Sequence, residues 1–197
     1  DLTDFRSVLN FKMSLVYGLL ALLLSCYTLY QTRKDHLLAL ARNARLPQLI
    51  YHAGLLLLGI LLGTYFAEGQ VSFEFFHIIG ILSLILATWC AWLASVVVND
   101  IYDGAIDRLT NPDRPLVVGT IPLPEYRLYG LICFLFSLLL SGIVSFSALL
   151  LILSYQALAT LYSAPPLRLK QYPGLATLIA ALAGMLVLII GIVAVVP

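Results

Sequence analysis

The stretch Ile78–Asp107 reads IIGILSLILATWCAWLASVVVNDIYDGAID and joins two opposite compositions. From Ile78 to Asn99 it holds no Asp, Glu, Lys or Arg, and at about 1.5 Å per residue such a helix crosses a bilayer. Asp100, Asp103 and Asp107 follow at once. The first prediction is therefore a membrane-spanning helix that ends in a cluster of acidic side chains.

The rest of the chain shares the apolar character of this stretch. Of its 197 residues, 61% are hydrophobic and 11% are charged, against about 25% charged in a typical soluble domain. The mean hydropathy is +1.00. This composition excludes a soluble globule and a disordered chain, and a formal net charge of +1 provides no basic field for nucleic acid. We expect an integral protein of the lipid bilayer.

Uncharged runs divide the chain into six predicted transmembrane helices. Besides Ile78–Asn99 they are Met13–Thr32, Leu46–Ala67, the two halves of Leu128–Leu167, and Gln171–Pro197. Leu128–Leu167 is about twice as long as a bilayer core requires, so we expect a tight turn near its Ser141, Gly142 and Ser145. The runs lack period-2 alternation, which predicts an all-α bundle. Met13–Thr32 exceeds the usual core of a secretory signal, about 7–15 residues, and is interpreted as a membrane helix.

The basic residues are unequally divided between the two sides that six spans create. One side receives 33–45, 100–127 and 168–170, which hold all the Lys and Arg residues except Arg6 and Lys12. Cytoplasmic loops carry such an excess of positive charge. We therefore expect a protein of the cytoplasmic membrane, with the segment after Asp107 facing the cytoplasm.

The acidic side chains share one helix face if the third span continues past Asn99. Relative to Asn99, a rotation of 100° per residue places Asp103 at about 40°, Asp107 at about 80° and Asp100 at about 100°. Ionised groups near a membrane need partners, and amide and carboxylate oxygens suit Mg²⁺, which often shares itself with substrate phosphates. The competing interpretation is a solvated helix extension whose acids are balanced by Arg108 and Arg114.

Two loops on the same side bring cations toward this face. The first runs from Thr110 to Pro122, where prolines and Gly119 stop the helix, and its Arg114 could clamp a phosphate with two nitrogens. The second is Tyr162–Lys170, in which Arg168 and Lys170 emerge after two prolines. Positive-inside topology alone would also place basic residues there. The cysteines and histidines match no metal-site spacing, so we assign them no chemistry.

Three segments resemble the UbiA superfamily of intramembrane prenyltransferases. Asn99-Asp100-x-x-Asp103-x-x-x-Asp107 is similar to the first aspartate-rich motif of that superfamily, Asn111–Ile121 to the stretch after it, and Tyr162–Lys170 to the segment between its fourth and fifth helices. Their order and spacing agree as well. The resemblance covers roughly residues 45–197.

This resemblance implies a bundle of about nine membrane helices around a cavity that binds a polyprenyl diphosphate through Mg²⁺. It implies metal ligands at Asn99, Asp103 and Asp107, with Asp100 in support, and catalytic roles for Asp103, Asp107 and Lys170. It also implies diphosphate contacts from Arg114, Arg168 and Lys170, with Tyr162 near the site. The acceptor would be a hydrophobic or aromatic molecule.

Two departures from the superfamily pattern lead to further expectations. No Asp or Glu follows Glu125, so the second aspartate motif is missing, and about four helices are absent by the family count. We expect the 197 residues to be an N-terminal portion that is inactive alone. The division predicted is 1–45, an extra helix with a basic link, and 46–197, the first five helices of the prenyltransferase domain.

The mechanism that the resemblance implies is prenyl transfer from an allylic diphosphate, with Tyr102 or Tyr162 stabilising an allylic cation by cation–π attraction. Two alternatives stay open. Asp100-x-x-Asp103-Gly104-x-x-Asp107-Arg108 partly resembles the CDP-alcohol phosphotransferase signature, although the further aspartate pair of that signature is missing. The other is a non-catalytic scaffold or transporter module whose acids bind an ion. Within prenyl transfer, the acceptor could be a quinone-precursor aromatic, a porphyrin side chain or a glycerol lipid, and a phosphoribosyl variant of the chemistry also stays open.

Overall fold

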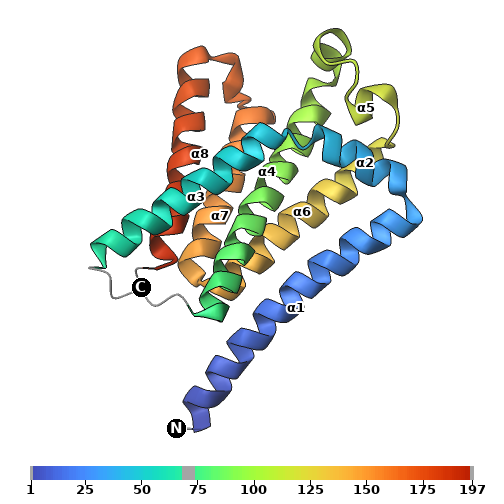
Figure 1. Cartoon of the computed structure of the whole chain (residues 1–197). Coiled ribbons are helices and arrows are strands. Elements are labelled where there is room, and N and C mark those ends of the chain that lie inside the picture. The colour runs from blue at the N-terminus through green and yellow to red at the C-terminus, as the bar shows by residue number, and fades with distance from the viewer. Residues whose placement is uncertain (1, 68–73, 196–197) are drawn as a thin grey trace.

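The computed structural model describes residues 2–67 and 74–195, with side chains from Arg6 onward, and these residues form a helical bundle (Figure 1). The helices are α1 (Leu2–Thr32), α2 (Lys34–Asn43), α3 (Leu46–Phe66), α4 (Phe75–Thr110), α5 (Pro115–Val118), α6 (Leu123–Val144), α7 (Phe146–Ser163) and α8 (Pro173–Val193), with a 3₁₀ turn, η1, at Leu169–Gln171. No strand occurs in these two ranges, which confirms the all-α prediction.

Six helices in the described part of the chain are long and apolar enough to cross a membrane, as predicted. The break inside the long uncharged run falls at Ser145, whose extended backbone (φ −161°) ends α6 and whose Oγ accepts a hydrogen bond from the Ala148 amide. Such N-cap bonds start a helix by pairing one of its free amides. The predicted starts differ most for α1, which begins at Leu2, and for α6, which begins at Leu123.

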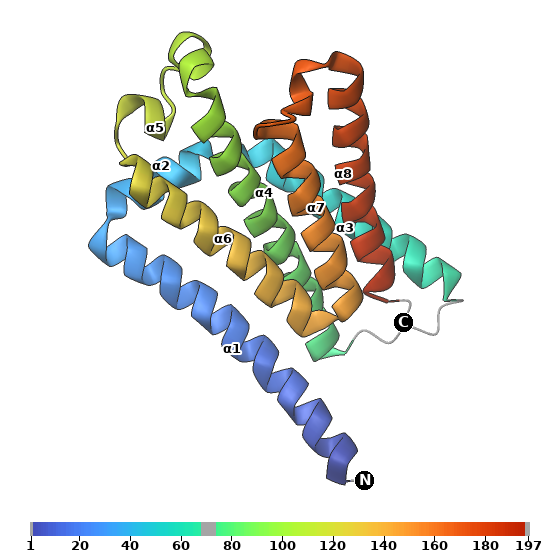
Figure 2. The same ribbon diagram turned by 180° about the vertical axis from the view of Figure 1, so that it is seen from behind.

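Helix α4 continues beyond the predicted span, as the acidic-face argument requires. Its 36 residues correspond to about 54 Å of helix, against about 30 Å for a hydrocarbon core. The aspartates after Asn99 therefore occupy the last turns of a helix longer than the membrane core. Since α4 packs against α1, α3, α6 and α7, it is the central element of the bundle, as Figures 1 and 2 show from opposite sides.

Helices α3 and α8 approach each other closely through glycines. A Cβ added to Gly59 would lie 2.0 Å from the backbone oxygen of Leu188, and one added to Gly191 would lie 2.1 Å from that of Leu56. In a bilayer, where lipid tails are as apolar as leucine, small residues allow the backbone contact that holds two helices together. Leu56 also belongs to a buried cluster with residues of α4, α7 and α8.

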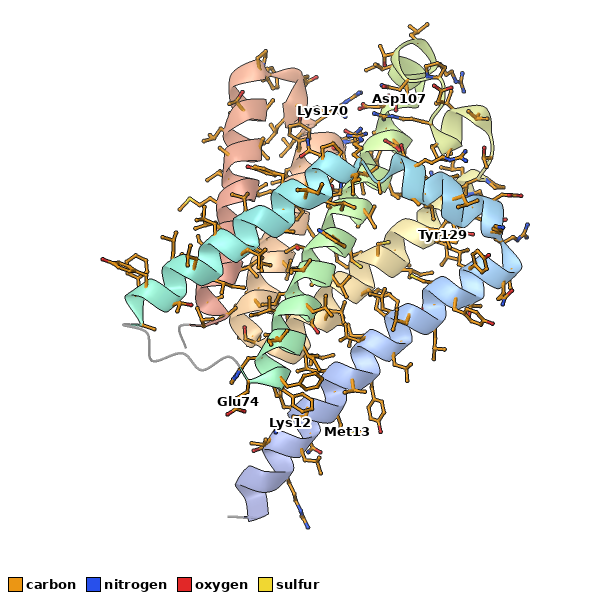
Figure 3. All side chains as sticks on the ribbon, in the orientation of Figure 1. Lys12, Met13, Glu74, Asp107, Tyr129 and Lys170 are labelled. Atoms are coloured by element: carbon orange, nitrogen blue, oxygen red, sulfur yellow. The ribbon has the colours of Figure 1, made fainter. Side chains whose placement is uncertain are left out.

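The predicted site residues gather at one end of the bundle. In Figure 3, Asp107 and Lys170 lie at the end where α4 stops, whereas Lys12 and Glu74 lie at the opposite end. The basic loops and the acidic turns of α4 thus share one side. This arrangement agrees with the division of charge predicted from the sequence.

Candidate active site

The four oxygen-bearing side chains at the end of α4 divide into two groups. Asp100, which is 1% exposed, points toward α2 and α6. Its Oδ2 accepts hydrogen bonds from Asn43 Nδ2 and Tyr126 Oη, both at 2.7 Å. Its Oδ1 accepts from Arg114 Nη1 at 2.7 Å and faces Arg45 Nη2 at 3.5 Å. Asp100 is therefore satisfied by four protein donors on the side of α4 that faces the N-terminal helices.

Arg114 links Asp100 to Asp107, which lies about two turns nearer the end of α4. Its Nη1 donates to Asp100 and also to Asp107 Oδ2, and Asn111 Nδ2 donates to Asp107 Oδ1 at 3.1 Å. The side chain of Arg114 is 14% exposed and that of Asp107 is 3% exposed. Burial of two carboxylates is tolerable here because an arginine and amide donors neutralise and pair them. Arg114 thereby fixes the loop that follows α4.

Asn99 and Asp103 form the second group, together with the loop between α7 and α8. Lys170 Nζ donates to Asn99 Oδ1 at 2.8 Å and to Asp103 Oδ2 at 2.5 Å. Arg168 Nη2 donates to the other carboxylate oxygen of Asp103 at 2.6 Å, and Ser163 Oγ donates to Asn99 Oδ1 at 3.3 Å. The structure thus joins the acidic motif to the basic loop that the sequence placed on the same side.

Two arginines of this site have a left-handed backbone. Arg45 has φ 56° and Arg168 has φ 39°, and they are the non-glycine residues with positive φ in the described part of the chain. This conformation costs an L-residue about 1–2 kcal/mol. Each of the two guanidinium groups faces a motif aspartate, Asp100 for Arg45 and Asp103 for Arg168. Backbone strain of this kind tends to occur where function requires a particular side-chain position.

The two tyrosines expected to stabilise an allylic cation differ in their exposure. Tyr102 is 45% exposed on α4, and Tyr162 is half-buried near the end of α7, next to Ser163. Of the two balancing cations in the competing interpretation, Arg108 is exposed and Arg114 pairs with Asp100 and Asp107. Asp100 and Asp107 are buried, however, and Asp103 pairs with Arg168 and Lys170. A solvated helix extension therefore does not describe this end of α4.

The donor set on the Asn99 side fits a magnesium ion. An amide oxygen and a carboxylate oxygen already converge on one cation, the ammonium group of Lys170. In the ranges that the structure describes, no three His, Cys, Asp or Glu residues form a metal-holding group. Mg²⁺ commonly takes one or two protein carboxylates and completes its shell with water and substrate phosphates. The identity of the ligands stays a prediction.

Sequence reasoning missed three partners of the site. Asn43 and Arg45 counted only as part of a basic link, and no spacing in the sequence connects them to Asp100. Tyr126 is fully buried at the start of α6 and could be found only from the packing of α6 on α4. The predicted boundary after residue 45 stays a prediction, but residues on both sides of it contact Asp100.

Curated relatives of the chain include three synthases. The chain is 40% identical over 65 residues to digeranylgeranylglyceryl phosphate synthase of Methanosphaera stadtmanae, covering 32% of this chain and 24% of that protein. It is 32% identical over 124 residues to the enzyme of the same name from Pyrococcus abyssi, covering 63% and 42%. It is 34% identical over 98 residues to chloroplastic chlorophyll synthase of Arabidopsis thaliana, covering 46% and 25%.

Two solved structures share the fold. One is a digeranylgeranylglyceryl phosphate synthase, with TM-score 0.69 and 24% identity over 80% of this chain and 53% of that chain. The other is a UbiA homolog from Archaeoglobus fulgidus bound to DMAPP and Mg²⁺, with TM-score 0.59 and 25% identity over 76% and 52%. The chain thus spans about half the length of the solved relatives and less than half of the curated ones.

The profile of one protein family matches the part of the chain that contains the site. The match runs over residues 74–197, more than half of the chain, and includes α4, both basic loops and the helices between them. It agrees with the resemblance of the acidic motif and with the shared fold of the solved structures. The chain is an integral membrane protein that belongs to the UbiA prenyltransferase family.

Proposed function

We propose that this chain carries the first aspartate motif and the diphosphate-binding loops of an intramembrane prenyltransferase. The donor is a polyprenyl diphosphate, and the acceptor is a hydrophobic or aromatic molecule. The observation that carries the proposal is the contact of Lys170 with Asn99 and Asp103, beside Arg168. It brings cation-binding oxygens and phosphate-binding cations to the same point, at the end of an apolar bundle.

Each residue of the two groups has a role in this proposal. Asn99 and Asp103, with Asp107 in support, would hold Mg²⁺, which lowers the free energy of the leaving diphosphate by neutralising its charge. Arg168 and Lys170 would donate to diphosphate oxygens, and Arg114 would do so from its position beside Asp107. Asp100 would act indirectly, by holding Arg114 in place, because protein donors enclose its carboxylate.

The reaction follows from this placement. The bond between the allylic carbon and the diphosphate oxygen breaks, and its electron pair leaves with the diphosphate. The apolar interior excludes water from the allylic cation, and a tyrosine face at Tyr162 or Tyr102 would lower its energy by cation–π attraction. The acceptor then bonds to the carbon and loses a proton.

The same proposal includes the place of the protein in the cell. The end of α4 would face the cytoplasm, where a charged diphosphate is soluble, and the prenyl tail would lie in the apolar bundle. The surplus of Lys and Arg at this end supports that orientation. The family match favours prenyl transfer over the CDP-alcohol phosphotransferase and ion-binding alternatives.

Diphosphate release by the whole protein tests the proposal. The protein is purified in detergent with Mg²⁺, a labelled polyprenyl diphosphate and a lipid or aromatic acceptor. The Asp103→Ala and Asp107→Ala variants should lose release, whereas Asp35→Ala, which removes an exposed carboxylate of α2, should retain it. Undiminished release by Asp103→Ala and Asp107→Ala would contradict the proposal.

A further inference from the structure

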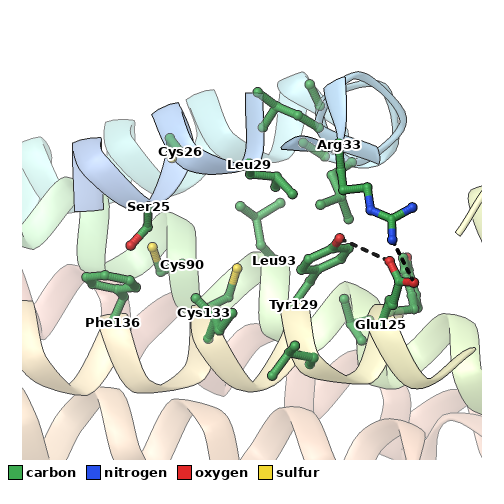
Figure 4. A pocket seen from close by; sticks show the side chains of 18 of the residues that line it. Ser25, Cys26, Leu29, Arg33, Cys90, Leu93, Glu125, Tyr129, Cys133 and Phe136 are labelled. Carbon is green, nitrogen blue, oxygen red and sulfur yellow. Dashed lines mark hydrogen bonds and ion pairs between the residues drawn. The ribbon is translucent and has the colours of Figure 1, made fainter. Parts of the chain in front are cut away.

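A cavity lies on the other side of α4 from Asn99 and Asp103. Its volume is about 790 Å³, within the range of about 300–1,000 Å³ usual for small-molecule sites. Its walls come from α1, α2, α4 and α6, including Ser25, Cys90, Cys133 and Phe136 (Figure 4). Apart from the residues of α2 and its two neighbours, Arg33 and Ala44, these walls belong to helices long and apolar enough to span a membrane.

The walls of this cavity change in character along its length. Most are apolar, formed by Leu, Val, Ala and Cys side chains such as Leu29 and Leu93. One end is polar, where Arg33 Nη2 lies 4.0 Å from Glu125 Oε1 and Tyr129 Oη lies 3.5 Å from Glu125 Oε2. Because α1 ends and α6 begins here, the polar end lies at the membrane boundary. A lipid in the bilayer has the same arrangement, with its head at the boundary and its tail inside.

The charged groups at the polar end indicate which lipid head group would fit there. Arg33 and Glu125 offset each other, and His36 adds a ring nitrogen 3.2 Å from Glu125 Oε2 and 2.9 Å from Tyr129 Oη. One cation, one carboxylate and a phenol can together donate to and accept from a neutral hydroxyl. Arg33 is the one cation among the described residues that line the cavity and it already faces Glu125, so these groups do not offset a phosphate.

We propose that the cavity between α1 and the α4–α6 pair binds a neutral lipid alcohol, with its hydroxyl beside Glu125 and Arg33. The cavity also includes Asn43 and Tyr126, the residues that donate to Asp100. An occupant therefore contacts two side chains that hold Asp100 in position to bind Arg114. Its binding does not require that the chain transfer prenyl groups.

Photolabelling in lipid nanodiscs tests this site without any measurement of activity. The probe is a long-chain alcohol with a diazirine in its tail, and peptide mass spectrometry locates the adducts. Adducts are expected on the facing segments of α1, α4 and α6. The unlabelled alcohol should reduce them, whereas the monophosphate ester of the same chain should compete about tenfold less well, a difference of about 1.4 kcal/mol. Competition by the ester at equal or lower concentration would overturn the proposal.

Two variants fill the cavity from opposite walls, and a third is their control. Cys133→Trp on α6 and Ser25→Phe on α1 should each lower labelling by about tenfold. Leu23→Trp adds bulk to α1 at a residue that is 65% exposed and does not line the cavity, and it should label as the unaltered protein does. Equal labelling of all three variants, or adducts scattered over the lipid-facing surface, would overturn the proposal.

Discussion

At the residue scale, two aspartates three positions apart on α4 have different surroundings. Asp100 is buried among Asn43, Tyr126 and Arg114, whereas Asp103 binds two cations of the loop before α8. Protein donors enclose Asp100. Beside Asp103, Arg168 and Lys170 can donate hydrogen bonds to a substrate diphosphate. We therefore expect the two aspartates to serve stability and binding, respectively.

The Asp100→Asn substitution tests the stability role. It removes the charge that pairs with Arg114 and leaves an amide inside a cluster of donors, so the protein should lose about 2 kcal/mol of stability. The apparent melting temperature in detergent measures this loss. The control is Asp35→Asn, a substitution at an exposed residue of α2. This variant should melt at the same temperature as the unaltered protein. An unchanged melting temperature for Asp100→Asn, combined with weaker Mg²⁺ dependence, would instead make Asp100 a metal ligand.

The acidic motif shows how far sequence reasoning reaches at this scale. Helical periodicity placed Asn99, Asp103 and Asp107 along one face of a continued helix, and α4 does continue to Thr110. The same periodicity put Asp100 at the edge of that face, but it could not show that Asn43 and Tyr126 lie beyond that edge. Those contacts depend on how α2 and α6 pack on α4, which local spacing does not determine.

At the element scale, helix lengths and boundaries follow from short signals in the sequence. Ser145 divides the long uncharged run by capping α7. Gly119, with φ 79°, ends α5 in the left-handed region that glycine adopts without strain. The close packing of α3 on α8 depends on Gly59 and Gly191. Single glycines in apolar runs gave no indication of which helix they would contact.

The Gly59→Ala substitution tests the contact between α3 and α8. Its Cβ would lie 2.0 Å from the Leu188 carbonyl oxygen, so the helices must separate. Such overpacking typically costs about 1–3 kcal/mol, measured as a lower melting temperature. Gly54→Ala on the same helix is the matched control, since its Cβ would meet no atom within 4 Å. Equal melting temperatures for the two variants would show that the close approach does not stabilise the bundle.

At the scale of the whole molecule, the charged groups are divided unequally between the two ends of the bundle. One end holds the acidic turns of α4, both basic loops and the polar end of the cavity beside α1, while Lys12 and Glu74 lie at the other end (Figure 3). This separation was predictable because loops alternate between two sides of a membrane. The cavity beside α1 was not, since its walls come from four separate segments.

Accessibility to an impermeant maleimide tests the orientation of the whole molecule. All three native cysteines are first replaced by alanine. Cysteine is then introduced at Leu109, 86% exposed near the end of α4, or at Phe75, 69% exposed at its start. In intact cells Phe75→Cys should be labelled, and Leu109→Cys only after permeabilisation. The reverse pattern would contradict the cytoplasmic position of the site.

Equilibrium binding of a labelled polyprenyl diphosphate in nanodiscs, titrated with Mg²⁺, tests directly whether Asn99 and Asp103 hold a metal–diphosphate. Binding should require Mg²⁺, and Asp103→Asn should weaken it by about tenfold or more, or about 1.4 kcal/mol. Asp35→Asn, which removes the same charge from an exposed position, should bind as the unaltered protein does. Mg²⁺-independent binding, or equal affinity for Asp103→Asn and Asp35→Asn, would contradict the claim that Asn99 and Asp103 hold the metal–diphosphate.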